Sequence, residues 1–297
     1  MADVTEISLG GLSAKVDAHG AQLSSLSLDG REYLWQADAH WWGKHAPILF
    51  PIVGSLRDDE ASSAAGTCHM GRHGLARDYD HELVENTGSS LTYRLESSAE
   101  TLEKYPYPFR LEMTYALEGA ATLAQTFAVT NTGDREMPFF LGGHPAFNVP
   151  VEPGERFEDY SLKFERSWTT STPVIADGGL LDYGEQVSLF EEADQLQLTH
   201  KLFARDAVVL EGVPGSAVEM VGPAGHGVRV DFPGFDHVGI WSAAAAADGA
   251  EAPFVAIEPW CGTATRTDED DVFEHKQNLL VAHPGETVTR TFRVTLL

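Results

Sequence analysis

A histidine within an apolar, glycine-containing stretch is the first residue of this sequence that suggests chemistry. The stretch Phe139 to Asn148 reads Phe-Phe-Leu-Gly-Gly-His-Pro-Ala-Phe-Asn, so His144 follows two glycines and precedes Pro145. Glycines allow another group to approach the backbone closely, and a proline favours an extended conformation for the residue before it. An imidazole titrates near neutrality, so a rigidly held His144 is a candidate general acid or base. The alternative is a histidine that ends a strand and bonds to a backbone carbonyl.

The second candidate is a carboxylate at the end of another apolar run. Glu258 follows Phe254 to Ile257 and precedes Pro259-Trp260-Cys261-Gly262. Burial beside a tryptophan raises the pKa of a carboxyl group towards that of a useful base. Glu258 is therefore a candidate base, and the alternative is a strand-end glutamate in a salt bridge.

The spacing of histidine and cysteine does not predict a metal site. His69 and His73 are four residues apart, which suits zinc when both residues lie on one face of a helix. Gly71 and Gly74 disfavour a helix here, and on a strand residues four apart are separated by ~13 Å. Adding Cys68 gives no familiar zinc spacing, so we predict no bound metal.

Other polar and aromatic residues lie where they can contact a ligand. Arg57 and Arg77 each precede an aspartate, which is also the pattern of a surface ion pair. Asp206 opens an apolar strand, either as a strand cap or as a ligand for a hydroxyl group. Trp241 is a candidate pocket wall, although aromatic residues in a large β protein more often belong to the core.

Motifs for several common chemistries are missing from the sequence. It contains no Gly-x-x-x-x-Gly-Lys phosphate loop, no Gly-x-Ser-x-Gly motif and no Cys-x-x-Cys pair. The candidates are instead imidazoles, carboxylates, arginine and tryptophan. Such a set suits a neutral polyhydroxylated ligand and proton transfer without a cofactor.

Short strands must position these residues. Phe109 to Leu117 alternates between apolar and polar residues, as in a half-buried strand, and Asp29-Gly30 predicts a two-residue hairpin turn. Ser98 is a candidate N-cap for one or two helical turns that stop at Pro106. In the second half we expect strands at 159–164, 195–198, 207–210, 217–220, 227–232, 238–241, 254–257 and 287–297. Strands at short spacing with little helix predict an all-β sandwich or barrel.

The composition limits the compartment and the partners. The chain has 297 residues, 43% of them hydrophobic, which is enough for a large core. Its formal net charge of −25 at pH 7 repels nucleic acid and anionic membranes. Two cysteines give no disulfide framework, no apolar run approaches the ~20 residues of a membrane helix, and the N-terminus shows no signal-peptide pattern. We predict a cytoplasmic protein with no nucleic-acid or membrane partner, and the sequence leaves the oligomeric state open.

Five short segments gain meaning from their order along the chain. They read Pro-Ile-Leu-Phe-Pro-Ile-Val-Gly-Ser-Leu-Arg (47–57), Arg-His-Gly-Leu-Ala-Arg (72–77), Tyr-Pro-Tyr-Pro-Phe (105–109), Gly-Gly-His-Pro-Ala-Phe (142–147) and Glu-Pro-Trp-x-Gly (258–262). Together they resemble the aldose 1-epimerase, or galactose mutarotase-like, family, and within it the LacX-type branch. The resemblance implies a large antiparallel β-supersandwich, in agreement with the strand pattern, and a single domain over residues 1–297.

The resemblance also implies roles for individual residues. Glu258 would be the general base at the anomeric hydroxyl, His144 the general acid at the ring oxygen, and His73 would assist or bind there. Substrate-binding roles are implied for Arg57, Asp206 and Trp241. The tryptophan after Glu258-Pro259 departs from the better-studied galactose enzymes and leaves galactose specificity open.

We therefore predict an isomerase that interconverts the α and β anomers of an aldose by acid/base ring opening and reclosure. Its only predicted partner is a small sugar, and it needs no cofactor. A reaction with Glu258 ionised and His144 protonated predicts a bell-shaped pH profile, with an acid limb from Glu258 and a basic limb from His144.

Three alternatives remain open. A sugar-phosphate mutarotase of the same fold would need extra basic residues around the pocket. A non-catalytic carbohydrate-binding or regulatory protein would bind sugar without turnover. A cupin-like metalloenzyme is the most distant of the three.

Overall fold

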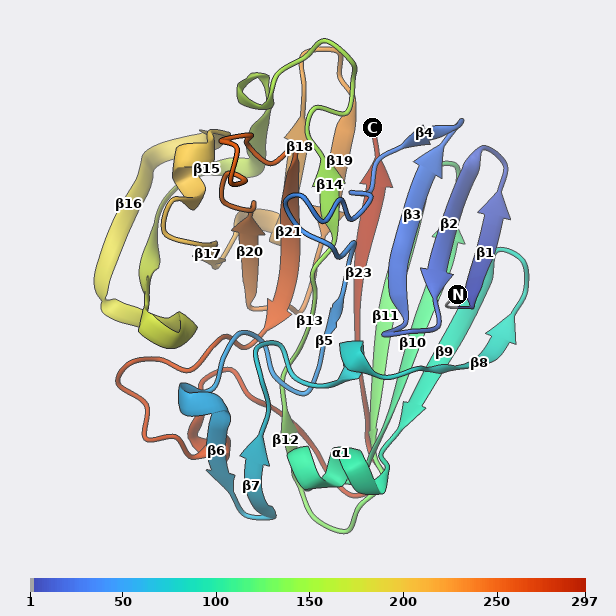
Figure 1. Ribbon diagram of the computed structural model, residues 1–297, viewed down its shortest axis with the longest axis vertical. Coiled ribbons are helices and arrows are strands. Elements are labelled where there is room, and N and C mark those ends of the chain that lie inside the picture. The colour runs from blue at the N-terminus through green and yellow to red at the C-terminus, as the bar shows by residue number, and fades with distance from the viewer. Residues whose placement is uncertain (1–2) are drawn as a thin grey trace.

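The computed structural model describes residues 3–297, and nearly all of its regular structure is strand (Figure 1). The all-β prediction is confirmed, because these residues contain a single α-helix, α1 (Ala99–Lys104). Within the same residues no helix is long and apolar enough to cross a membrane.

Two local predictions from the sequence are also confirmed. Ser98 caps α1 by accepting a hydrogen bond from the Thr101 N–H, while the Thr101 hydroxyl accepts one from the Ser98 N–H. At the predicted hairpin, Asp29 and Gly30 both have positive φ, 50° and 82°. A type I′ turn requires positive φ at both central residues, and this turn joins β3 to β4.

Most strands belong to three antiparallel sheets. The four-stranded sheet contains β1 (Val4–Leu9), β2 (Leu12–Asp17), β3 (Gln22–Leu28) and β4 (Arg31–Glu32), in that order. The nine-stranded sheet contains, in spatial order, β16 (Leu180–Gln197), β15 (Ser161–Ala176), β18 (Ala217–Val221), β19 (Gly227–Asp231), β23 (Thr287–Leu296), β11 (Thr122–Asn131), β10 (Phe109–Glu118), β9 (Ser90–Glu96) and β8 (Glu82–Asn86). The six-stranded sheet contains β17 (Val208–Glu211), β20 (His237–Trp241), β21 (Phe254–Cys261), β13 (Leu141–Gly143) and β5 (Ile48–Leu49), with β14 (Ala146–Asn148) also paired to β21.

Smaller elements complete the described chain. Two short hairpin-like pairs are β6 (Glu60–Ser63) with β7 (Gly66–His69), and β12 (Met137–Phe139) with β22 (Leu280–Ala282). Single 3₁₀ turns lie at Arg57–Asp59, Ala76–Asp78, Phe157–Asp159, Asp177–Gly179, His200–Phe203, Pro214–Ser216 and Phe273–His275.

The four-stranded sheet packs against one half of the nine-stranded sheet to form a sandwich. In Figure 1, β1 to β4 lie across β9, β10 and β11. Alternate residues of both sheets join one large apolar core, and two buried tyrosines add polar links between the layers. The Tyr115 hydroxyl donates to the Ala21 carbonyl at 2.5 Å, and the hydroxyls of Tyr93 and Thr5 are 2.9 Å apart.

The two faces of β21 contact different apolar clusters. Successive residues of a strand point to opposite sides of the sheet. On one side, the main core takes Val255, Ile257 and Cys261. On the other side, Phe254, Ala256 and Trp260 belong to two smaller clusters. Glu258 shares the parity of this second set, so the buried strand holds a carboxylate on the face turned away from the main core.

Strands β15 and β16 are much longer than the sequence predicted. We expected strands only at 159–164 and 195–198, whereas β15 and β16 extend to the turn at Asp177–Gly179. Few of their added residues are buried, most being exposed or half-buried, and the pairing is interrupted by several register shifts. Both features remove the regular apolar alternation on which the prediction depended.

Candidate active site

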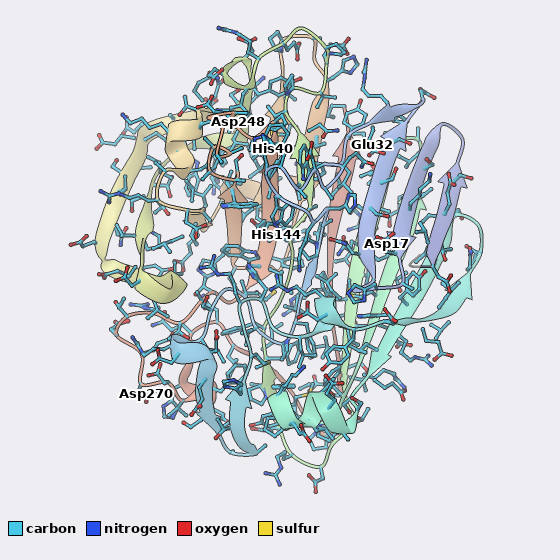
Figure 2. The ribbon with its side chains drawn as sticks, viewed as in Figure 1. Asp17, Glu32, His40, His144, Asp248 and Asp270 are labelled. Atoms are coloured by element: carbon cyan, nitrogen blue, oxygen red, sulfur yellow. The ribbon has the colours of Figure 1, made fainter. Side chains whose placement is uncertain are left out.

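One cavity brings together five of the six residues predicted to form a site. Its volume is about 480 Å³, and its wall includes His73, His144, Asp206, Trp241 and Glu258. This volume lies within the range of small-molecule sites. Figure 2 labels His144 near the middle of the molecule, close to the strands of the six-stranded sheet.

Strand register explains how His144 meets Glu258. β21 pairs with β13 through Gly142 and Trp260, and with β14 through Ala146 and Ala256. His144 lies midway between these two pairs and therefore opposite Glu258. The His144 Nε2 is 3.3 Å from the Glu258 Oε2, and both side chains are almost completely buried. Two residues 114 positions apart thus meet because their strands are neighbours.

Close backbone approach around this pair depends on small residues. Gly239 on β20 pairs with Glu258, and a Cβ at Gly239 would overlap the six-membered ring of Trp260. A Cβ at Gly142 would lie 2.8 Å from Trp260 Cδ1. The indole beside Glu258 therefore lies flat against two strands that carry no side chain at these points.

Gly239→Ala is expected to lower the free energy of unfolding by ~1–3 kcal/mol, because the added methyl group must displace Trp260 in a packed site. Urea unfolding measures this change. Gly71→Ala is the matched control, since no atom lies within 4 Å of its added Cβ. Equal stability of the two variants would contradict the packing described for Trp260.

Burial shifts the pKa values of the pair in opposite directions. It raises the pKa of Glu258 well above the usual range, with a further increase from Asp206, opposed by the Trp260 indole and Arg72. Burial, together with the positive charges of Arg77, Lys44 and Arg72, lowers the pKa of His144 to about 3, although a hydrogen bond with its own backbone acts in the opposite direction. When the pair holds one proton, these opposite shifts place that proton mainly on Glu258. This order is the reverse of the sequence-based expectation, which took His144 as the more basic group, because neither side chain keeps the hydration that reference values assume.

His73 has one ring nitrogen already occupied. The backbone N–H of Gly54 donates to His73 Nδ1 at 3.2 Å. The backbone N–H of His73, in return, donates to the Gly54 carbonyl at 2.7 Å. Because Nδ1 accepts a hydrogen bond, the ring proton is assigned to Nε2. Burial and the neighbouring His144 lower the pKa of His73 well below its usual value. His73 is therefore suited to donate a hydrogen bond from Nε2 rather than to act as a strong base.

Arg72 and Asp206 form the polar part of the cavity wall. Arg72 Nη1 is 3.3 Å from Asp206 Oδ2, and Arg72 Nε donates to the Ser55 hydroxyl at 3.3 Å. Gly179 makes room for this guanidinium, because a Cβ there would overlap Arg72 Nη2. The pair offers both donors and an acceptor to hydroxyl groups of a ligand.

Arg57 does not belong to the cavity wall, contrary to the role that its sequence motif implied. Its Nε donates to both carboxylate oxygens of Asp271, at 3.0 and 3.1 Å. Its Nη2 donates to the carbonyls of Arg266 and Thr267. These acceptors come from residues more than 200 positions away, so the motif alone did not reveal them. We therefore withdraw Arg57 as a candidate sugar ligand.

Two cavity residues, Arg72 and Trp42, were not considered as ligands from the sequence, and Arg77 was considered only beside the alternative of a surface ion pair. Arg72 and Arg77 lie in the same segment as His73, and Trp42 is the second of two adjacent tryptophans before Gly43. The Trp42 ring stacks on the His144 imidazole with centroids 4.9 Å apart. The available signals were the two arginines that flank the His73 motif and the unusual tryptophan pair.

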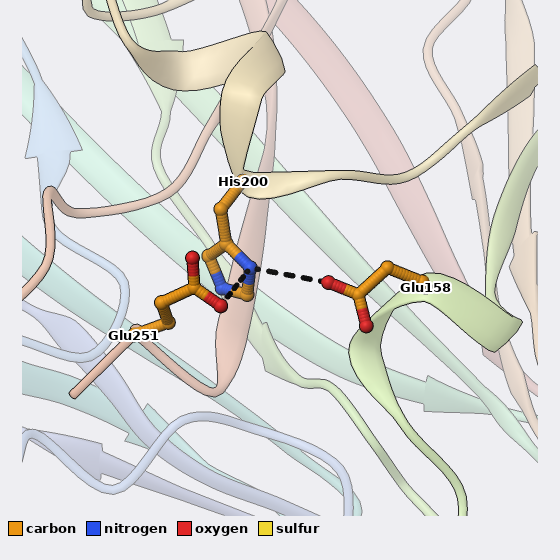
Figure 3. Close-up of side chains that lie close together, drawn as sticks. All are labelled: Glu158, His200 and Glu251. Atoms are coloured by element: carbon orange, nitrogen blue, oxygen red, sulfur yellow. Dashed lines mark ion pairs between the residues drawn. The ribbon is translucent and has the colours of Figure 1, made fainter.

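Outside the cavity, one group within residues 3–297 has the composition of a metal site. Glu158, His200 and Glu251 offer ligand atoms within 4.8 Å of one another (Figure 3). His200 Nδ1 is 3.7 Å from Glu158 Oε1 and 3.2 Å from Glu251 Oε2. Both carboxylates are about half exposed, so the arrangement is also that of an ordinary surface ion-pair cluster. The other histidine pair considered, His69 and His73, is not part of such a group.

Comparisons of the sequence and of the structure with known proteins point to the same family. The sequence profile described as Aldose 1-epimerase matches residues 3–293. The chromosomal protein LacX of Lactococcus lactis subsp. lactis is 37% identical over 295 residues, which cover 96% of this chain and 97% of LacX. A galactose mutarotase related enzyme from Lactobacillus acidophilus has a TM-score of 0.90 and 33% identity, covering 99% of this chain and 97% of that protein. A galactose mutarotase-like protein from Lactobacillus casei ATCC 334 has a TM-score of 0.89 and 30% identity, covering 99% of this chain and 100% of that protein.

Proposed function

The chain belongs to the aldose 1-epimerase family, as its motifs predicted, and from this premise we propose that it interconverts the α and β anomers of an aldose. The observation that carries the proposal is the buried His144–Glu258 contact of 3.3 Å in the wall of a cavity of sugar-binding size. In our proposal Glu258 is the general base, His144 is the general acid, and His73 assists them.

The proposed reaction moves two protons in each half. Glu258 in its ionised form takes the proton of the hydroxyl on C1, and protonated His144 gives its proton to the ring oxygen. The bond between C1 and the ring oxygen breaks as the C1 carbonyl forms. The aldehyde rotates about C1–C2, and the same two transfers run backwards to close the ring on the other face. Each positioned transfer contributes ~10²–10⁴-fold.

Burial favours the protonation states that Glu258 and His144 reach when the sugar ring opens. The reactive form carries the shared proton on His144, whereas burial favours a proton on Glu258 and a neutral imidazole. Ring opening therefore returns both side chains to their uncharged forms. Because the two groups exchange one proton, they titrate as a coupled pair.

Hydrogen-bonding groups around the pair support a polyhydroxylated substrate. We assign Asp206 and Arg72 to sugar hydroxyls, His73 Nε2 to an oxygen near C1, and Trp241 to the apolar wall. All four residues belong to the cavity wall. Alternating donors and acceptors next to aromatic surface suit a sugar ring, which has polar edges and apolar faces.

A phosphorylated aldose is a second candidate substrate, because the cavity collects positive charge in a protein of net charge −25. Arg72 and Arg77 belong to its wall, and the pKa of Lys44 is lowered by burial and, to a smaller extent, by the nearby charge of Arg77. Arg77 Nε is buried and, among the described residues, has no hydrogen-bond partner; its nearest carboxylate is Asp78 Oδ1, at 4.0 Å. These are the extra basic residues that a sugar-phosphate mutarotase requires.

A polarimetric screen of freshly dissolved α-aldoses, each tested with and without a 6-phosphate, is expected to show catalysed mutarotation in at least one series. Faster turnover of the phosphorylated series would assign the cationic side of the cavity to a phosphate. Calorimetric binding of a sugar without catalysis at any pH would defeat the isomerase proposal and favour a binding protein.

We also place this activity in the cytoplasm and in one domain formed by the whole chain. Cys68 and Cys261 are free and buried, so the protein gains nothing from an oxidising compartment.

A further inference from the structure

We infer that Trp42 is a positioning residue for His144, holding the imidazole in its reactive orientation by stacking. This inference rests on the proposed function, because it assigns His144 to proton transfer. Neither the sequence motifs nor the similarity to known proteins assigns a role to Trp42.

The geometry places three rings around the His144 imidazole. Trp42 lies nearly parallel to it, with centroids 4.9 Å apart and an interplanar angle of 25°. Trp241 and His73 meet it edge-on, with centroids at 5.5 and 5.6 Å. Trp42 alone among the three covers a face of the imidazole.

The usual anchor of a catalytic histidine is missing here. Such a ring normally donates its second N–H to a carboxylate or a carbonyl, which fixes its orientation. His144 Nδ1 is buried, and within residues 3–297 no other residue forms a hydrogen bond with it; the ring has only its own backbone as a polar neighbour there. Rotation of the ring about its Cβ–Cγ bond is therefore limited by packing, and the largest flat contact is with Trp42.

Trp42 is itself held firmly by its own segment. The backbone N–H of Trp42 donates to the Asp38 carbonyl at 3.0 Å, and the backbone carbonyl of Trp42 accepts a hydrogen bond from Trp35 Nε1 at 2.9 Å. The adjacent Trp41 donates from Nε1 to the Ala250 carbonyl at 2.9 Å. Figure 2 shows His40 and Asp248 side by side above His144, and their ion pair of 3.3 Å joins the same two segments. Because these contacts fix the segment that carries Trp42, its indole can hold the His144 imidazole that stacks on it.

Stacking on an indole also favours the charged form that the reaction needs. The face of an indole attracts a cation, so Trp42 stabilises His144 when it carries the proton. Arg77, Lys44 and Arg72 oppose that charge, whereas the ionised form of Glu258, with Oε2 3.3 Å from His144 Nε2, supports it. Trp42 thus helps the ring both to point correctly and to become protonated.

Trp42→Leu is expected to lower kcat at least ~10-fold with less than ~3-fold change in KM, because misplacement of a catalytic group affects the chemical step. Trp42→Phe, which keeps a flat ring, should recover most of kcat. Trp168→Leu is the matched control, because Trp168 packs against Phe164 and Phe190 on the nine-stranded sheet, outside the cavity wall, and its kcat should match the wild type. A rise in KM with unchanged kcat for Trp42→Leu would overturn the inference and make Trp42 only a wall of the cavity.

A second measurement tests the inference without any assay of turnover. In NMR spectra, the ring protons of His144, assigned by their loss in His144→Asn, should shift in Trp42→Leu and stay in place in Trp168→Leu. Unchanged His144 signals in Trp42→Leu would overturn the positioning role. If the wild type fails to catalyse mutarotation, the proposed function fails, whereas the stacking seen by NMR stands or falls separately. Trp42→Phe supports the same comparison should Trp42→Leu not fold.

Discussion

Glu258→Gln should reduce mutarotase turnover ~10²-fold or more and leave sugar binding nearly intact. The amide keeps the size and shape of the side chain, yet it cannot accept the proton of the anomeric hydroxyl. Polarimetry of the preferred α-aldose gives the rate, and calorimetry of the same sugar gives the affinity. Glu112→Gln serves as the control, because Glu112 pairs with Arg94 on the nine-stranded sheet, outside the cavity. Turnover that survives Glu258→Gln would transfer the role of base to another residue.

The same substitution should change stability with a definite dependence on pH. The folded pKa of Glu258 is raised, so its contribution to stability is complete below the unfolded value of about 4.5 and is lost as pH rises through the folded pKa. Glutamine has no such loss. The Tm of Glu258→Gln relative to wild type should therefore rise from pH 4 to pH 8, as thermal unfolding followed by circular dichroism would show. A constant difference in Tm would mean that Glu258 ionises at an ordinary pKa.

His144→Asn should lower kcat by ~10²–10⁴-fold, because the general acid is lost while a polar side chain of similar width remains. In the wild type, kcat/KM should follow a bell, because the pair needs one proton in total. As pH falls, a second proton binds His144 and inactivates the pair, so the acid limb belongs to His144 and lies near its pKa of about 3. As pH rises, Glu258 loses the shared proton, so the basic limb belongs to Glu258 and lies well above the usual carboxyl range.

An NMR titration of His144 checks this assignment directly. The imidazole should remain neutral from pH 8 down to about pH 4, since burial lowers its pKa to about 3. A His144 that titrates near its reference value of ~6.5 would restore the original assignment, with the basic limb due to His144.

Local sequence patterns were enough to predict many elements of the fold. Ser98 and Asp29-Gly30 specify a cap and a turn within four residues, so the sequence alone predicted both. The alternation in Phe109 to Leu117 survives as β10, which extends from Phe109 to Glu118. The long outer parts of β15 and β16 were missed, because strands that bury few residues and shift register carry no periodic apolar signal.

The site was predictable where chemistry and motif coincided and unpredictable where long-range pairing decided. His144 and Glu258 follow apolar runs and have side chains suited to proton transfer. Arg57 has the right chemistry, but its hydrogen bonds to Asp271 depend on a contact across 214 positions. The pKa order of the pair was also out of reach, because it follows from burial by surrounding strands rather than from residue type.

The burial of β21 on both faces has a consequence for how sugar preference can diverge. Its backbone is paired on both sides and every one of its residues is buried, so its amide hydrogens should exchange only when the whole protein unfolds. A substitution on this strand therefore lowers the free energy of unfolding of the whole protein, whatever its effect on ligand binding. The segments that carry Trp42, Arg72 and Asp206 lie outside regular strands and are more exposed, so they tolerate replacement at lower cost. Substitutions that change sugar preference should therefore occur mainly in those segments, while the sequence of β21, which carries Glu258, should change more slowly.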